Sequence, residues 1–347
     1  MPKALLDEVF QPIVGMESPF RYRNKAQYPI RRDKSGKIIA GFYAGRTHDV
    51  IACDDCLLGV EENKAILNAI VRWMEDYSID PYDEKSGEGL VRHVLCRKGF
   101  RSGQHMVCLV INGTSLPHQD ALVEKLSPHV DSLSFSVNME NTNVIMGTKI
   151  VHLYGPGYIE DSIGEVRFRI SPLSFYQVNP VQTAVLYGLA VEAAQLTGRE
   201  VVLDAYCGIG TIGLTAADRA KQVVGVELNR DAVRDAIGNA KHNGVKNARF
   251  FAADATAWIC EAAAAGERAD VIFMDPPREG STPQFIESVA RMAPRRVVYV
   301  SCNPETMARD LALLTKKGYR AEGFTPVDMF PNSEHIEVVC ALSRQKR

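Results

Sequence analysis

The sequence lacks the features that mark several special classes of protein. It has no uncharged apolar run of roughly 18 residues, the length that a membrane-spanning helix needs. Residues 1–15 include Asp7 and Glu8 and have no apolar stretch of the kind found in secretory signals. The composition is 46% hydrophobic and 24% charged, which excludes a disordered or fibrous chain. We therefore predict a globular cytoplasmic protein without a membrane partner.

Cysteine is missing from the start of the chain. No cysteine precedes Cys53, and the eight cysteines lie in apolar or motif contexts, which favours reduced thiols over a disulfide framework. Cys53 and Cys56 form a Cys-x-x-Cys pair, but an iron–sulfur cluster normally needs more thiolates than these two. We expect no iron–sulfur cluster and no other metal in this chain.

The pattern of the sequence changes near Gly164, which predicts two domains, residues 1–164 and 165–347. In the first part, apolar and polar residues alternate at 91–97, 105–111 and 132–138, as in β-strands. Two further stretches, 61–77 and 118–129, have helical patterns. Strands in runs joined by Gly, Asn and Asp turns favour an antiparallel α+β domain. We expect the chain to be a monomer.

The second part alternates strands and helices. Asn179 and Pro180 are typical of a helix N-cap and first turn, and they begin a helix at 181–196. Strands are then predicted at 201–205, 222–227, 248–252, 270–275 and 297–301. Such alternation implies a parallel sheet covered by helices on both faces. The last two strands, 319–327 and 335–342, have no room for a helix between them, which predicts an antiparallel terminal hairpin.

A glycine-containing turn follows the first of these strands. Gly208 and Gly210 stand before a helix, where glycine lets a ligand approach the backbone and the helix N-terminus favours an anion. Glu227 ends the next strand, about 20 residues on, where a carboxylate can hold two ribose hydroxyls. Asp254 follows the third strand and can reach an adenine amino group. A nicotinamide dinucleotide would satisfy the same pattern, so this turn alone does not choose between cofactors.

The fourth and fifth strands end in motifs with reactive side chains. Asp275-Pro-Pro-Arg follows the fourth, and Ser-Cys302-Asn-Pro ends the fifth. Ligands of an open α/β sheet bind outside the carboxyl ends of the strands, near the switch in strand order. Asn303 and Pro304 begin a helix directly after Cys302, and the free amides and dipole of a helix N-terminus favour a thiolate. We therefore predict that Cys302 is a reactive cysteine.

Separated motifs in a fixed order carry a resemblance that covers nearly the whole chain. They are PIVGME at 12–17, YRNK at 22–25, FYQVN at 175–179, DPPR at 275–278, SCNP at 301–304 and HIE at 335–337. The sequence resembles the RNA (uracil-5-)-methyltransferases, and within them the 23S rRNA branch more than the tRNA branch. The resemblance does not extend to the N-terminal oligonucleotide-binding barrel and cysteine cluster that many members carry. It implies S-adenosylmethionine as cofactor, and an α/β fold in which a Rossmann-like class I methyltransferase domain with the terminal hairpin follows an α+β RNA-binding domain.

The resemblance also implies roles for particular residues. Cys302 is the nucleophile that adds to carbon 6 of uracil, and Glu337 is the base that acts after methyl transfer. The residues implied in cofactor binding are Gln177, Tyr206, Gly208, Gly210, Thr211, Glu227, Asp254 and Asp275. Phe175 lies beside the target base, and Asp275 also bonds its imide edge, which would favour uracil over cytosine. The chemistry agrees, because thiolate addition makes carbon 5 nucleophilic and a base is then needed for elimination.

Any RNA-binding surface must be a local patch, since the 347 residues carry a net charge of only −2. Residues 21–37 are strongly basic, and Arg31 and Arg32 are the predicted phosphate contacts. Tyr22 and Tyr28 lie among them, where they would stack on unpaired bases. A second cluster comprises Arg92, Arg97, Lys98 and Arg101. A run of charge is as often only a solvated face. The target must be flipped or lie in a loop, because carbon 6 is unreachable inside a helix stack.

Other functions stay open on the sequence. The tRNA branch shares the chemistry, so 23S rRNA is the expected substrate and tRNA the alternative. A cytosine-5 methyltransferase is disfavoured, because that class resembles a pattern with a Pro-Cys nucleophile and no Pro-Cys occurs. Methylation of an adenine amino group would favour Asn-Pro-Pro-aromatic in place of Asp275-Pro-Pro-Arg. A non-catalytic RNA-binding assembly factor is a further alternative, against which intact Cys302 and Glu337 argue.

Overall fold

The computed structural model describes residues 9–345, which form two compact units. The C-terminal unit comprises Ile163–Phe168, Ser174–Arg347 and Met1–Glu17, within its described residues. The N-terminal unit comprises Ser18–Ser162 and Arg169–Leu173. The division departs from the expected boundary at residue 164, because residues 9–17 pack with the C-terminal unit.

The C-terminal unit is built on a seven-stranded sheet with the order β12-β11-β10-β13-β14-β16-β15. Its strands are β10 (Val201–Ala205), β11 (Gln222–Glu227), β12 (Ala248–Ala252), β13 (Val271–Met274), β14 (Arg296–Ser301), β15 (Tyr319–Val327) and β16 (Glu337–Arg344). The five strands from β10 to β14 are parallel, and β16 runs antiparallel between β14 and β15. The predicted alternating fold and terminal hairpin are confirmed.

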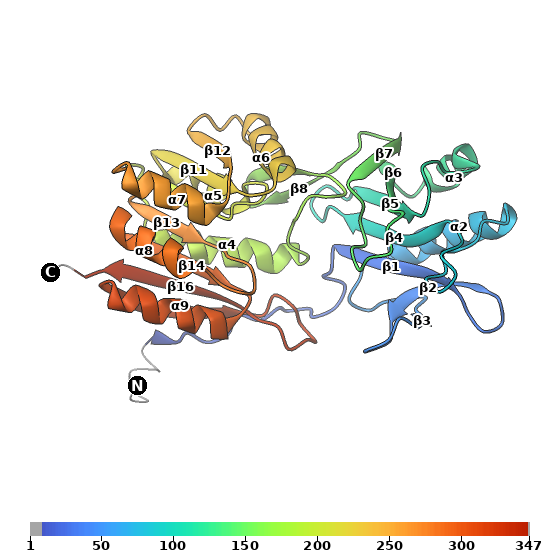
Figure 1. Cartoon of the computed structure of the whole chain (residues 1–347), viewed down its shortest axis with the longest axis horizontal. Coiled ribbons are helices and arrows are strands. Elements are labelled where there is room, and N and C mark those ends of the chain that lie inside the picture. The colour runs from blue at the N-terminus through green and yellow to red at the C-terminus, as the bar shows by residue number, and fades with distance from the viewer. Residues whose placement is uncertain (1–8, 346–347) are drawn as a thin grey trace. The chain divides into compact units, whose positions relative to one another are not determined.

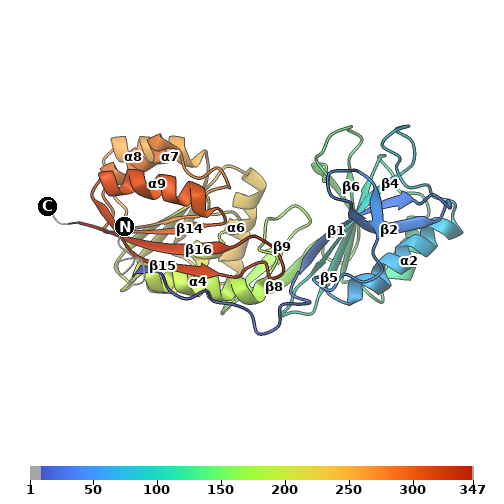
Figure 2. The same ribbon diagram turned by 90° about the horizontal axis from the view of Figure 1, so that it is seen from below.

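Helices cover both faces of this sheet. They are α4 (Pro180–Ala194), α5 (Thr211–Ala216), α6 (Arg230–His242), α7 (Ala255–Ala264), α8 (Pro283–Met292) and α9 (Pro304–Lys316), with a 3₁₀ turn at Ala217–Arg219. Figure 2 shows α7, α8 and α9 on one face and α4 on the opposite face. Ile272, Phe285 and Tyr299 are fully buried between the sheet and the first of these layers. Burial on both faces explains why the inner strands β10, β13 and β14 read as mostly apolar runs.

Residues 9–17 belong to the C-terminal unit through main-chain bonds to β15. Phe10 lies opposite Phe324 and Val14 lies opposite Val327 in short parallel bridges. The side chain of Gln182 on α4 donates to the Val14 carbonyl at 2.9 Å. The two bridges join segments that are more than 300 residues apart in the chain, and the Gln182 contact spans 168 residues.

The N-terminal unit is an α+β structure with a second seven-stranded sheet, of order β3-β2-β1-β4-β5-β6-β7. Its strands are β1 (Lys25–Arg32), β2 (Ile38–Tyr43), β3 (Val50–Ala52), β4 (Val91–Lys98), β5 (His105–Ile111), β6 (Ser132–Val137) and β7 (Lys149–Tyr154). Strands β8 (Ile159–Ile163) and β9 (Val166–Ile170) form a separate two-stranded sheet. Figure 1 labels β1 to β8, and Figure 2 labels β9.

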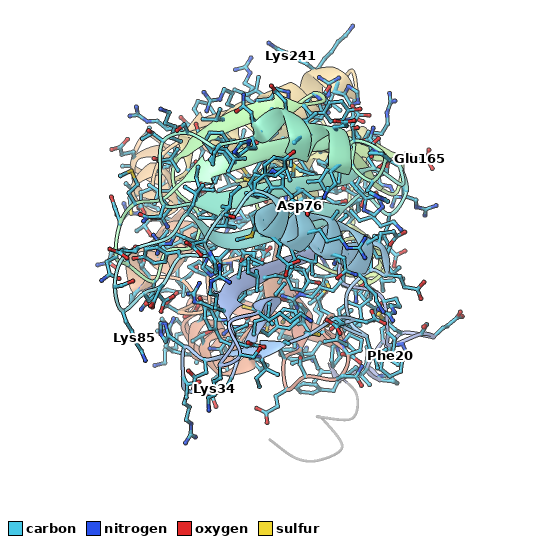
Figure 3. All side chains as sticks on the ribbon, turned by 90° about the vertical axis from the view of Figure 1, so that its right-hand side faces the viewer. Phe20, Lys34, Asp76, Lys85, Glu165 and Lys241 are labelled. Carbon is cyan, nitrogen blue, oxygen red and sulfur yellow. The ribbon has the colours of Figure 1, made fainter. Side chains whose placement is uncertain are left out.

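Two helices, α2 (Glu62–Asp76) and α3 (Gln119–Leu126), pack against this sheet, as predicted. Ile66, Ile70 and Trp73 recur at helical spacing along α2 and are buried. Figure 3 shows α2, with Asp76 labelled, lying over the strands. One pair departs from the expected antiparallel arrangement: β5 and β6 are parallel, because α3 connects them and a crossover returns the chain in the same direction.

Candidate active site

The turn after β10 leaves open space beside the backbone at the carboxyl end of the sheet. Tyr206 has a φ of 65° and Gly210 one of 84°, so the chain turns sharply into α5. Asp204 is buried and accepts a hydrogen bond from the Gly213 amide at 2.8 Å, which fixes the helix to the strand. No atom lies within 4 Å of the point where a side chain at Gly208 would begin. A ligand therefore has room against this turn.

Two carboxylates follow the neighbouring strands, as predicted. Glu227 accepts hydrogen bonds from the Gly208 amide at 3.1 Å and from the Asn229 amide at 2.8 Å. Asp254 is exposed and caps α7 by accepting from the Ala257 amide at 2.8 Å. The turn and both carboxylates thus stand after three adjacent strands, β10, β11 and β12. This arrangement fits the ribose and base of a nucleoside cofactor.

Three more of the residues implied in cofactor binding are held in place by hydroxyl contacts. The Thr211 hydroxyl donates to the Tyr187 hydroxyl of α4 at 3.3 Å, and the Gln177 side chain also bonds Tyr187. Burial raises the pKa of Tyr187, so this phenol stays neutral. The hydroxyls of Tyr206 and Ser281 lie 3.2 Å apart.

The three residues expected to carry the chemistry meet at one edge of the sheet. Ser301 pairs with Val338 across β14 and β16, so the next residues, Cys302 and Glu337, come opposite each other. Strand β13 runs parallel to β14, which brings Asp275 to the same edge. Electrostatic effects of Glu337 and Asp275 on the Cys302 thiol agree with this proximity. The sequence placed these residues at strand ends, and the strand order brings them together.

Burial dominates the electrostatics of this group. Glu337 is only 3% exposed, and burial followed by the Asp275 carboxylate raises its pKa. Burial also raises the pKa of Asp275. The pKa of the half-buried Cys302 thiol is raised by burial first and then by Glu337 and Asp275. Arg278 and a backbone hydrogen bond at Cys302 lower this pKa, the second in the direction expected of a helix N-terminus, but they do so by less than burial and the two carboxylates raise it.

Two residues without a predicted role stand at this site. Arg278 is exposed, and its positive charge lowers the pKa of both Cys302 and Glu337 against the effect of burial. Leu228 follows Glu227 and is 69% exposed. The sequence feature that could have pointed to Arg278 is its position as the one basic residue of the DPPR motif. Nothing in the sequence pattern distinguished Leu228.

Phe175 belongs to the C-terminal unit and is 67% exposed. The preceding residue, Ser174, donates its hydroxyl to Asp235 of α6 at 2.8 Å. The residues that follow, Tyr176 and Gln177, are buried. The chain is therefore anchored on both sides of Phe175 while its ring stays open to a partner.

Several predicted RNA-contacting side chains are instead buried in the N-terminal unit. Residues 25–32 of the basic stretch form β1, which pairs with β2 on one side and β4 on the other. Tyr22 and Tyr28 are each 2% exposed, so the prediction that they stack on RNA bases is wrong. Arg92 and Arg97 are 4% and 2% exposed and donate to main-chain carbonyls. Two members of the second basic cluster are therefore inside the unit, while Lys98 is half-buried and Arg101 is exposed.

The two predicted phosphate contacts differ from each other. Arg31 is half-buried and forms an ion pair with Glu84. Arg32 is exposed and pairs with the exposed Asp80 at 2.6 Å. Lys34, labelled in Figure 3, lies on the turn after β1 and is also exposed. Of the two arginines, Arg32 is the one whose guanidinium is accessible from solvent.

The thiols of Cys53 and Cys56 are free and half-buried. Across residues 9–345, no three or more His, Cys, Asp or Glu side chains are grouped so that they could hold a metal ion. None of the helices in this described range combines the length and the apolar character that a membrane span requires.

The strand order, the glycine turn and the carboxylates after the neighbouring strands define a Rossmann-like, S-adenosylmethionine-dependent methyltransferase. Residues 158–345 match the family model described as tRNA (Uracil-5-)-methyltransferase. The chain belongs to the RNA (uracil-5-)-methyltransferase family.

Relatives and a solved structure agree with this assignment. An uncharacterized RNA methyltransferase of Halalkalibacterium halodurans is 47% identical over 335 residues, which cover 96% of this chain and 73% of the relative. One of Clostridium tetani is 42% identical over 341 residues, covering 97% and 74%. The tRNA (uracil-54, C5)-methyltransferase of Pyrococcus abyssi, solved with S-adenosyl-L-homocysteine, is 29% identical with a TM-score of 0.83, over 95% of this chain and 78% of that one.

Proposed function

We propose that this protein methylates carbon 5 of a specific uridine in 23S rRNA through a covalent adduct between Cys302 and carbon 6. The observation that carries the proposal is the meeting of Cys302, Glu337 and Asp275 at one sheet edge. The cofactor supplies an electrophilic methyl group. A uracil ring does not accept this group unaided, because its carbon 5 is a poor nucleophile.

Cys302 supplies the missing nucleophilicity. Its sulfur forms a bond to carbon 6, and the π electron pair of the ring moves to give an enolate whose carbon 5 carries the reactive pair. The half-buried thiol must first lose its proton to solvent, and Arg278 favours that loss. Asp275 bonds the imide edge of the ring, and Phe175 lies against its face.

Glu337 acts after methyl transfer. Its carboxylate takes the proton from carbon 5, the ring double bond re-forms, and the Cys302 thiolate leaves carbon 6. A carboxylate whose pKa is raised by burial is a stronger base than an exposed one, which suits proton removal near neutral pH. Addition and elimination thus use two different side chains.

The substrate rests on different support from the chemistry. The sequence resembles the 23S rRNA branch, which favours rRNA. The likeness to the tRNA (uracil-54, C5)-methyltransferase of Pyrococcus abyssi favours tRNA as the second candidate. Incubating the protein with rRNA and tRNA from a strain without 5-methyluridine, then mapping the modified position by mass spectrometry, decides between them. Modification of tRNA alone would overturn the 23S rRNA proposal.

Removing either catalytic group must stop the reaction at a different stage. Cys302→Ala should form no adduct with RNA, whereas Glu337→Gln should add, methylate and then stall. An RNA with 5-fluorouridine at the target should trap the wild-type protein, because fluorine cannot leave as a cation. Denaturing gels and mass spectrometry would show RNA attached to the peptide that contains Cys302.

Cys260→Ala is the matched control, since Cys260 is a half-buried thiol of the same unit that does not face Asp275 or Glu337. It should form the adduct like the wild type. An adduct with Cys302→Ala would exclude Cys302 as the nucleophile. Free turnover by Glu337→Gln would assign the base to another residue.

A further inference from the structure

The loop that carries Arg278 is bound along the first turns of α9, the helix that begins after Cys302. The Arg278 carbonyl accepts from the Asn303 side chain and from the Thr306 hydroxyl, each at 3.1 Å. The Arg309 guanidinium donates to the Glu279 carbonyl at 2.7 Å. The N-cap residue of α9 and two side chains of the helix itself therefore hold the backbone of this loop.

Asp310 is the buried centre of these contacts. Its side chain is fully buried and accepts from the Ser281 amide and from the Tyr299 hydroxyl of β14, both at 2.7 Å. Arg309 donates to its other carboxylate oxygen at 2.9 Å. Burying a carboxylate carries a desolvation penalty that an apolar side chain at the same position would not, and these donors offset it. The proposed chemistry does not use Asp310.

The loop fits this pair closely. Gly280 has a φ of 77°, and a side chain there would begin 2.6 Å from the Arg309 guanidinium and 2.7 Å from an Asp310 oxygen. The loop is also tied to the cofactor turn, because the hydroxyls of Ser281 and Tyr206 lie 3.2 Å apart. The loop therefore has no space to move closer to α9 at Gly280.

We propose that Asp310, with Arg309 and Thr306, is a positioning unit that holds the loop and keeps the Arg278 charge next to Cys302. None of the three contacts the reacting atoms; they act through Arg278. The inference rests on the proposed role of Cys302. It adds a set of positioning residues on α9 to that role.

The charges around Cys302 and Asp310 determine in which direction the pH profile of Cys302 should shift. The groups that face Cys302 are Glu337 and Asp275, which favour the thiol, and Arg278, which favours the thiolate. Those that face Asp310 are Arg309, Tyr299 and Tyr206. Loosening the loop should therefore raise the pH at which Cys302 ionises.

The test is the pH dependence of alkylation of Cys302 by iodoacetamide, followed on its own peptide by mass spectrometry. Arg278→Gln should move the midpoint of the profile up by about half a pH unit or more. Asp310→Asn and Thr306→Val should move it in the same direction by less. Direct loss of a negative charge at Asp310 would move it down, so an upward shift identifies the loop as the cause.

Two matched controls keep the outcome specific. Thr315→Val removes a hydroxyl from the same helix, and Arg291→Gln removes an exposed cation from α8; neither should shift the profile. If Asp310→Asn does not fold, Thr306→Val decides the matter. The proposal is overturned if Asp310→Asn and Thr306→Val both show the same pH profile as the wild type. Where Asp310→Asn does not fold, a profile of Thr306→Val like that of the wild type is enough to overturn it. The readout needs no methyl transfer, so it can fail while the adduct experiment succeeds, and the reverse.

Discussion

The Asp204 carboxylate accepts one hydrogen bond, from the Gly213 amide at 2.8 Å, while its other oxygen has no hydrogen-bond partner among residues 9–345. Burial raises the pKa of this carboxyl to about 7. A carboxyl group that resists ionisation in the folded state ionises freely in the unfolded chain. The cost of keeping it buried therefore depends on pH.

We expect Asp204→Asn to gain stability relative to the wild type as the pH rises. Below the pKa of an unfolded Asp, both side chains are neutral. Between that value and about 7, the unfolded wild-type chain releases its proton first, so the stabilising contribution of the protonated Asp204 is lost. Urea unfolding at about pH 5 and about pH 8 measures the difference. An equal stability gap at both values would show that Asp204 ionises normally.

The Glu227 carboxylate is expected to bind the cofactor ribose. Glu227→Ala should weaken S-adenosylmethionine binding by about 1.5–3 kcal/mol, the range for a hydrogen bond to a charged group. Because Glu227 also accepts from two loop amides, Glu227→Gln serves as the control that keeps an acceptor and should lose less. Isothermal titration calorimetry measures both. Unchanged affinity in Glu227→Ala would remove this residue from the site.

The Asp275 carboxyl is expected to recognise the imide edge of uracil. Asp275→Asn should strongly reduce uracil methylation, because the substituted amide presents a different pattern of donor and acceptor at that edge. The RNA-free chain should keep its fold, which circular dichroism verifies. Undiminished methylation by Asp275→Asn would refute this role.

Substitutions of Arg32 and Arg31, both on β1, should have different effects, the first on RNA binding and the second on stability. Arg32→Gln should weaken RNA binding and lower the slope of log K against log salt by about 0.7–0.9 for one lost phosphate contact. Cofactor affinity should not change. Arg72→Gln, an exposed arginine of α2, is the control. If the slope of log K against log salt is the same as in the wild type, Arg32 does not contact a phosphate and is an ordinary solvated charge.

Arg31→Gln should instead act on folding. Its partner Glu84 keeps His48 and Tyr43 but loses the charged guanidinium in a half-buried setting, which we expect to cost about 1–3 kcal/mol of the free energy of unfolding. Loss of the exposed Arg32–Asp80 pair should cost no more than about 1 kcal/mol. Denaturant unfolding of the two variants gives the comparison directly. Equal losses would mean that burial does not distinguish these pairs.

The C-terminal sheet was largely readable from the sequence. Strands β10, β13 and β14 are buried on both faces, so their runs are mostly apolar and bounded by glycine and polar turns, whereas the edge strand β12 is largely exposed. The caps at Asn179 and Asn303 marked helix starts that the structure confirms, each with a side chain accepting from the first turn. Local chemistry decides such features, and local chemistry is what a sequence displays.

The N-terminal sheet was harder to read for the opposite reason. Lys25 and Arg31 lie in β1, a strand that pairs on both sides. The basic residues in this strand made it read as a charged surface segment, although Tyr28 and Ile30 are buried. The buried state of Arg92 depends on carbonyls contributed by residues 138 and 140, far along the chain. The ionisation of Cys302 likewise depends on Glu337 and Asp275, which only the strand order brings near. Such long-range contacts have no local signature.

The place of β16 in the sheet has a consequence for how the protein is made. This strand lies between β14 and β15 although it follows both in the chain, and it also supplies Glu337. During synthesis, β15 therefore has no sheet to join until β16 has left the ribosome, and residues 9–17, which bridge to β15, wait with it. We therefore expect residues 9–17 and the terminal hairpin to become ordered together, so that the carboxylate proposed as the base joins the site later than the cysteine proposed as the nucleophile.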